Sequence, residues 1–148
     1  MENLSSGDLD ISKPGISVDK TTDEGIYSKV AIVDDESSLV MLFSLALRKG
    51  NYSIVKTCSN GKEFLEYLES IEGLEDPELP NVVLMDYRMP VLDGLETAKL
   101  LRINFPEMKI IMVSGFELPN ESIGYFDAHL RKPVAIEELL QKVYSVTA

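Results

Sequence analysis

Two aspartates stand side by side directly after a short apolar run, in the stretch VAIVDDESS. The carboxylates of Asp34 and Asp35 repel each other, and a divalent cation with oxygen ligands is one way to hold both in the charged form. Three more apolar runs end in Asp86, in Ser114 and just before Lys132. An aspartate can attack phosphorus, and a metal ion and a lysine can offset the charge on a transferring phosphoryl group. Brought together, these side chains suggest a site that takes up one phosphoryl group.

Taken alone, each of these residues also has an ordinary structural interpretation that involves no chemistry. Helix N-termini collect acidic and hydroxyl residues, so Asp35 and Ser37 offer N-cap chemistry for the helix that follows. Ser114 alone would be an ordinary strand end, and Asp93 with Gly94 reads as a loop and helix start without chemistry. Only convergence of the strand ends promotes these positions to a site.

The elements that must position these residues alternate regularly along the chain. Short apolar runs predict five strands, at 29–33, 52–58, 81–86, 108–115 and 128–133. Amphipathic or apolar stretches predict helices at 38–50, 60–73, 93–105 and 135–146, with one or two helical turns within 117–126. This alternation indicates an α/β protein with a doubly wound parallel sheet and helices on both faces. Ligands of such sheets bind outside the carboxyl ends of the strands, where the polar residues stand.

Composition limits the classes of function. The chain has 148 residues, enough for one domain, and a formal net charge of −11, which repels nucleic acid. The longest apolar region, residues 39–47, is too short to span a membrane. A single cysteine, Cys58, allows no internal disulfide and fits a cytoplasmic location. Residues 1–28 lack a sustained period and are predicted to form a flexible N-terminal tail, with docking through Ile11, Ile16 or Ile26 as an alternative.

Four motifs in this order resemble the receiver domain of two-component response regulators. They are VDDE, LMDYRMPVLDG, VSG and RKP, and the similarity extends over residues 29–148 apart from the last few. The resemblance implies a flavodoxin-like fold with strand order 2-1-3-4-5. It also implies a cis peptide bond between Lys132 and Pro133.

The same resemblance implies a role for each site residue. Asp86 would be the phosphoacceptor, and Asp34 and Asp35 would position Mg²⁺ together with Asp86 and the backbone carbonyl of Arg88. Ser114 would follow the phosphoryl group, and Lys132 would contact it.

Three features depart from the usual pattern of the family. His129, the only histidine, stands where the family usually has a switch tyrosine or phenylalanine, and we expect it to share the switch with Ser114. The stretch between Ser114 and Lys132 is shorter than usual, which predicts a shortened or irregular fourth helix. The acidic loop at residues 72–80 looks longer than usual and receives no role.

The sequence thus predicts a stand-alone signalling protein of a two-component phosphorelay, and not an enzyme. Asp86 would accept a phosphoryl group from a histidine kinase or phosphotransfer protein, and the face made by the fourth helix, fifth strand and last helix would then control an unidentified output protein. One alternative is a receiver-like interaction module that is never phosphorylated. Another is an aspartate-nucleophile phosphatase, although the adjacent aspartates lack the one-residue spacing of that class. A nucleotide or flavin site is disfavoured because no glycine-rich loop follows the first strand.

Overall fold

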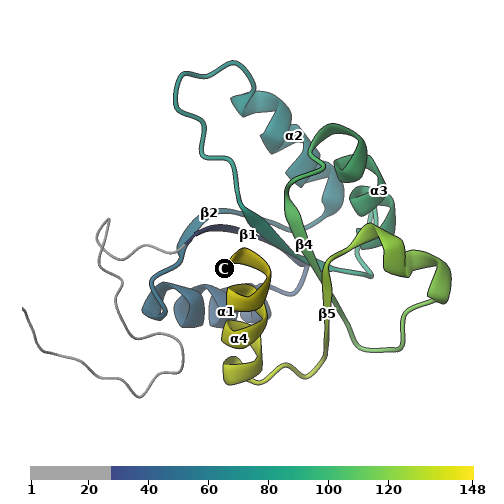
Figure 1. Ribbon diagram of the computed structural model, residues 1–148. Helices are drawn as coiled ribbons and strands as arrows, with labels where there is room; N and C mark the ends of the chain where they lie inside the picture. Colours follow the sequence, from purple (N-terminus) through teal and green to yellow (C-terminus); the bar gives the residue numbers. More distant parts are fainter. Residues whose placement is uncertain (1–27) are drawn as a thin grey trace, which may run out of the picture.

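A five-stranded parallel sheet forms the centre of the computed structural model, which describes residues 28–148 (Figure 1). The predicted tail at residues 1–28 lies outside the described residues except for Ser28, and so do the three isoleucines considered for its docking. The strands are β1 (Lys29–Val33), β2 (Ser53–Cys58), β3 (Val82–Asp86), β4 (Lys109–Ser114) and β5 (Ala128–Arg131). The helices are α1 (Ser37–Lys49), α2 (Gly61–Ile71), α3 (Gly94–Asn104), the 3₁₀ helix η2 (Asn120–Tyr125) and α4 (Ile136–Thr147).

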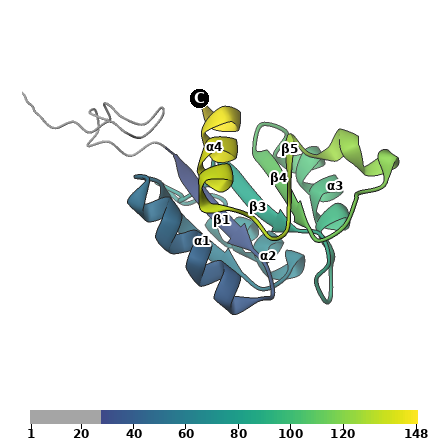
Figure 2. The same cartoon turned by 90° about the horizontal axis from the view of Figure 1, so that it is seen from below.

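The sheet has the predicted topology. Its strand order is β2-β1-β3-β4-β5, and every neighbouring pair is parallel. Figures 1 and 2 show α1 and α4 on one face of the sheet and α2 and α3 on the other. The doubly wound architecture and its strand order are therefore confirmed.

Alternation along the strands builds a separate apolar layer on each face. In β1, Val30 and Ile32 pack with residues of α1 and α4, whereas Ala31 and Val33 pack with residues of α2 and α3. Successive side chains of a strand point to opposite faces, so a strand that is buried on both sides needs a continuous apolar run. This explains why β1, β3 and β4 are apolar between their ends, whereas the edge strand β2 includes Lys56 and Thr57.

The segment after β4 confirms the expected shortening of the fourth helix. It forms only the six residues of η2, with Pro119 preceding its first turn. The guanidinium of Arg102 on α3 holds the end of this segment, because it donates to the backbone carbonyls of Tyr125 (3.2 Å) and Met108 (2.9 Å) and to the Asp127 carboxylate (2.7 Å). Polar contacts of Arg102 thus fix the segment between η2 and β5, where a full fourth helix is lacking.

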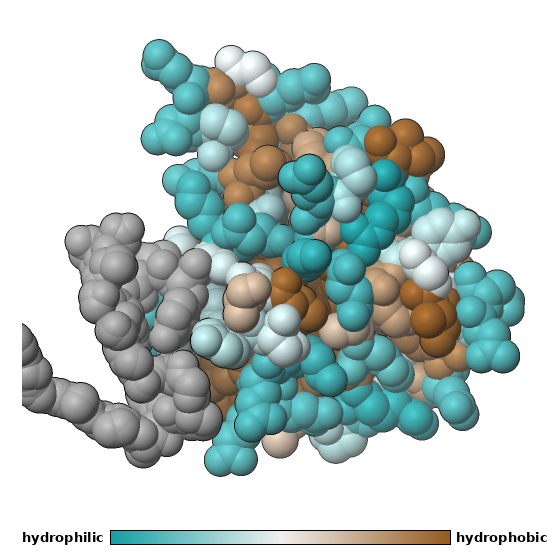
Figure 3. Space-filling view, viewed as in Figure 1, coloured by the Kyte–Doolittle hydropathy of each residue, from teal (hydrophilic) through white to brown (hydrophobic). Residues whose placement is uncertain are grey.

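The face of the described residues seen in Figure 3 is mostly hydrophilic, with hydrophobic groups between polar side chains. Helix α1 exposes three large apolar residues: Met41, Leu42 and Leu45. The Tyr67 hydroxyl of α2 donates to the Glu78 carbonyl oxygen of the acidic loop (2.7 Å). Among the residues that the structure describes, no helix combines the length and the apolar character needed to cross a membrane.

Candidate functional site

The carboxyl ends of four strands bring the predicted residues to one edge of the sheet. Asp34 directly follows β1, and Asp86 and Ser114 are the last residues of β3 and β4. Lys132 directly follows β5, and its backbone N–H donates to the Ser114 carbonyl oxygen (2.7 Å). The peptide bond between Lys132 and Pro133 is cis, as the resemblance implied.

Three carboxylates form the acidic centre of this edge. Asp34, Asp35 and Asp86 each offer an oxygen atom, and these atoms lie within 4.8 Å of one another. Asp34 and Asp86 are buried, with 4% and 6% of their surface exposed, whereas Asp35 is exposed. The sequence placed these acids together correctly, but it did not distinguish the buried member of the adjacent pair from the exposed one.

Our expectation for the start of helix α1 was wrong. Its N-cap residue is Glu36, and neither Asp35 nor Ser37 caps the helix through a side chain. The Asp34 carboxylate instead accepts a hydrogen bond from the Glu36 backbone N–H (2.9 Å). Because this bond turns the chain from β1 into α1, the buried aspartate is fixed in place and Asp35 is left free to face the site.

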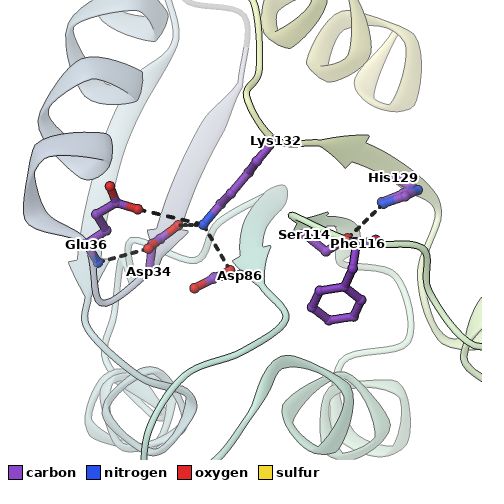
Figure 4. A network of polar contacts seen from close by, with 7 residues as sticks. All are labelled: Asp34, Glu36, Asp86, Ser114, Phe116, His129 and Lys132. Carbon is purple, nitrogen blue, oxygen red and sulfur yellow. Dashed lines mark hydrogen bonds and ion pairs between the residues drawn. The ribbon is translucent and has the colours of Figure 1, made fainter.

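One ammonium group lies among the carboxylates. The Nζ atom of Lys132 is 3.2 Å from Asp86 Oδ1, 3.4 Å from Asp34 Oδ2 and 4.0 Å from Glu36 Oε1 (Figure 4). Glu36 was not among the predicted site residues. It is the third acid of the DDE run, so the sequence signal for it was present but was assigned to helix capping.

Burial and mutual repulsion perturb both buried carboxyls. Burial, the Asp34 charge and more weakly Asp35 raise the pKa of Asp86 to about 6, although Lys132 opposes the shift. Burial also raises the pKa of Asp34, against the lowering effect of the Glu36 N–H and of Lys132. For Lys132, burial lowers the pKa, but Asp34 and Asp86 outweigh burial and the net shift is upward. A single lysine therefore does not compensate the negative charge of this site.

Ser114 and His129 meet beside the carboxylates. The Ser114 hydroxyl donates to the Phe116 carbonyl oxygen (2.6 Å), and the His129 Nε2 atom lies 3.1 Å from Ser114 Oγ (Figure 4). His129 belongs to β5 and pairs in register with Met112, two residues before Ser114 on β4. The two residues proposed as a switch are thus in direct hydrogen-bond contact.

The loop after β3 packs tightly under the site. The Arg88 guanidinium lies 4.4 Å from the centre of the Phe116 ring, and Arg88 itself is exposed. A Cβ atom at Gly94 would lie 2.4 Å from the Asp86 carbonyl oxygen, so only glycine fits there. Asp93 caps α3 by accepting from the Glu96 N–H (2.8 Å), which confirms the predicted helix start. Sequence reasoning missed the contact of Gly94 with Asp86, because a helix start with an Asp-Gly pair has an ordinary explanation.

Comparison with known proteins identifies the family. The model of the response regulator receiver domain matches residues 30–144. The chain belongs to this receiver-domain family.

Curated relatives of this receiver domain are longer proteins. Response regulator MprA of Mycolicibacterium vanbaalenii is 29% identical over 119 residues, which are 78% of this chain and 48% of that protein. The transcriptional regulatory protein LnrK of Bacillus subtilis is 33% identical over 90 residues, which are 60% of this chain and 38% of that protein. The receiver domain thus spans less than half the length of either relative.

Solved structures share the fold. The response regulator TrrA of Thermotoga maritima, solved in complex with Mg²⁺ and BeF, is 28% identical with a TM-score of 0.69, covering 80% of this chain and 97% of that one. A response regulator receiver domain protein of Methanospirillum hungatei is 27% identical with a TM-score of 0.66, covering 79% of this chain and 90% of that one. The receiver domain of NarL from Mycobacterium tuberculosis, at 23% identity and a TM-score of 0.71, supports the fold alone and covers 82% of this chain and 97% of that one.

Proposed function

We propose that this receiver domain is a phosphoacceptor that takes up one phosphoryl group on Asp86 in two-component signalling. The observation that carries the proposal is the contact of the Asp86 carboxylate with Lys132 inside a cluster of three aspartates. A buried carboxylate at the end of a central strand is a suitable nucleophile, and the lysine beside it is placed to offset charge on the incoming group. A purely structural ion pair would not require two further acids beside it.

The donor set of the site fits Mg²⁺. Three carboxylate groups within reach of one another supply hard oxygen ligands, and the raised pKa values of Asp34 and Asp86 indicate that Lys132 alone does not neutralise them. Asp34, Asp35 and Asp86 would hold the ion, and the backbone carbonyl of Arg88 remains a predicted further ligand. When bound, Mg²⁺ would supply positive charge to the oxygens of the transferring phosphoryl group.

The chain's own residues would carry out the transfer as follows. A carboxylate oxygen of Asp86 forms a bond to phosphorus, while the bond from phosphorus to the donor breaks and the donor atom keeps the electron pair. Lys132, which is 3.2 Å from Asp86 Oδ1, stays beside the new acyl phosphate and balances its charge. Ser114, buried at the end of β4, supplies a hydroxyl that can donate to a phosphoryl oxygen.

A phosphoryl addition test examines this chemistry directly. The protein is incubated with acetyl phosphate and Mg²⁺, and its intact mass is measured beside samples with EDTA. We expect one Mg²⁺-dependent phosphoryl addition that is lost in Asp86→Asn and kept in Asp76→Asn, which changes an exposed acid of the 72–80 loop. Absence of the addition from wild-type protein with Mg²⁺ would overturn the proposal and favour an interaction module that is never phosphorylated.

The proposed phosphodonor is a histidine kinase or phosphotransfer protein in the cytoplasm. Helix α1 begins three residues after Asp34 and exposes Met41, Leu42 and Leu45. An exposed apolar face on the helix that follows Asp34 is suited to pack against a helix of the donor. An unidentified output protein would bind the face that contains η2, β5 and α4, which includes His129.

The donor surface can be tested separately from the chemistry. Leu45→Glu should slow transfer from a phosphorylated donor protein and leave labelling by acetyl phosphate unchanged, because the small donor needs no docking surface. Ile103→Glu is the matched control, since Ile103 is an exposed apolar residue on α3, on the other face of the sheet. Equal transfer rates for both variants would argue against α1 as the docking helix.

A further inference from the structure

The hydrogen bonds around Ser114 determine which atom carries each proton. A serine hydroxyl has one hydrogen, and the Phe116 carbonyl oxygen at 2.6 Å can only accept it. Ser114 Oγ therefore has no hydrogen left for His129. The Nε2 atom of His129, 3.1 Å away, must itself carry a hydrogen and donate it to Ser114 Oγ.

The surroundings of His129 favour one neutral form of its ring. Burial, and then the positive charges of Arg131 and Lys142, lower its pKa. At neutral pH the imidazole accordingly has a single ring N–H. The contact with Ser114 assigns that hydrogen to Nε2, which leaves Nδ1 without one.

We propose that His129 is a positioning residue that holds Ser114 Oγ as an acceptor on one side, so that the hydroxyl hydrogen is directed to a single partner. This inference rests on the proposed function. Without a phosphoryl group, that partner is the Phe116 carbonyl oxygen. With a phosphoryl group on Asp86, the hydrogen turns to a phosphoryl oxygen while the bond from His129 is kept.

If the Ser114 hydroxyl exchanges its hydrogen-bond partner, phosphorylation of Asp86 would affect β5, an edge strand of the sheet. The Phe116 carbonyl loses its hydrogen bond, and the Phe116 ring is already engaged by Arg88. His129 lies on β5, and its retained hydrogen bond to Ser114 would pass a movement of Ser114 to this strand. A phenylalanine at this position would have no donor for this bond, whereas the ring N–H of His129 supplies one.

Nitrogen NMR of the ring tests the proton assignment. His129 is the only histidine, so ¹⁵N-histidine labelling of untagged protein yields a single set of ring signals. Wild-type protein at neutral pH should show a protonated Nε2 and a bare Nδ1. In Ser114→Ala the Nε2 signal should shift or the ring should become a mixture of tautomers. A protonated Nδ1 with a bare Nε2 in the wild type would overturn the proposal.

Two substitutions separate positioning from packing. His129→Gln keeps a side-chain N–H donor and should label with acetyl phosphate within twofold of wild type. His129→Leu keeps the bulk but not the donor, and loss of one hydrogen bond should slow labelling by about three- to fivefold. Equal rates for Gln and Leu would show that His129 only packs.

The NMR and intact-mass measurements also distinguish a failure of this inference from a failure of the proposed function. Intact mass of the same wild-type samples reports phosphoryl addition at Asp86 independently of the ring signals. Absence of addition would overturn the proposed function, and with it the exchange of partners at Ser114. Phosphoryl addition together with the wrong tautomer would overturn the role of His129 alone.

Discussion

Removing the charge of Asp86 should make the metal-free protein more stable. The folded-state pKa of Asp86 is about 6, against an ordinary value of 3.8. The folded state therefore binds the Asp86 proton more tightly than the unfolded state does. The stabilisation that the bound proton gives the folded state is fully present below pH 3.8 and is lost as the pH rises through about 6. A difference of about two units corresponds to about 3 kcal/mol of unfavourable free energy at pH 7. Because the amide introduced by Asp86→Asn is neutral, the variant should be about 1–3 kcal/mol more stable there.

Urea unfolding in EDTA, followed by circular dichroism at several pH values from about 4 to 8, measures this difference. The difference in unfolding free energy between Asp86→Asn and wild type should be small near pH 4, increase towards pH 6 and stay constant above pH 7. Asp76→Asn controls for the loss of one negative charge at an exposed position. Added Mg²⁺ should stabilise wild type more than Asp86→Asn. A gap that is absent at pH 7, or that does not change with pH, would refute the reasoning.

Three further predictions concern the loop and the segment that support the site. Val91 has a φ of 70°, which strains a β-branched side chain. Val91→Gly should therefore raise the unfolding free energy by about 1 kcal/mol. A lower unfolding free energy for the variant, measured by urea unfolding, would contradict this. Gly94→Ala would force a Cβ atom against the Asp86 backbone and should lower stability by about 1–3 kcal/mol in the same assay, whereas an unchanged midpoint would show that the loop shifts freely. Arg102→Met removes the guanidinium that donates to the Asp127 carboxylate and to the Met108 carbonyl oxygen and should lower stability by about 2–4 kcal/mol. Arg102→Lys should not restore the loss, because an ammonium cannot match the planar fork, and full recovery in calorimetry would disprove that role.

The main features of the fold could be predicted because they depend on local patterns. Apolar runs such as residues 29–33 and 81–86 reveal strands buried on both faces, and parallel strands must place their carboxyl ends at the same edge. This rule alone brought Asp34, Asp86 and Lys132 together. The stretch from Ser114 to Lys132, which is short compared with the family pattern, predicted a shortened fourth helix, and the six residues of η2 stand in its place.

Only the tertiary structure could reveal the contacts within the site. Adjacent Asp34 and Asp35 are chemically identical, and the bond from the Glu36 N–H buries one while the other stays exposed. Ser114 and His129 are 15 residues apart, and the register of β4 with β5 brings their polar atoms to 3.1 Å. Sequence periodicity predicts which side of an element is buried, but such distances depend on how elements far apart in the chain pack. For this protein the sequence therefore determined the fold and the identity of the clustered carboxylates, while packing determined their charge balance and the hydrogen bond of the histidine.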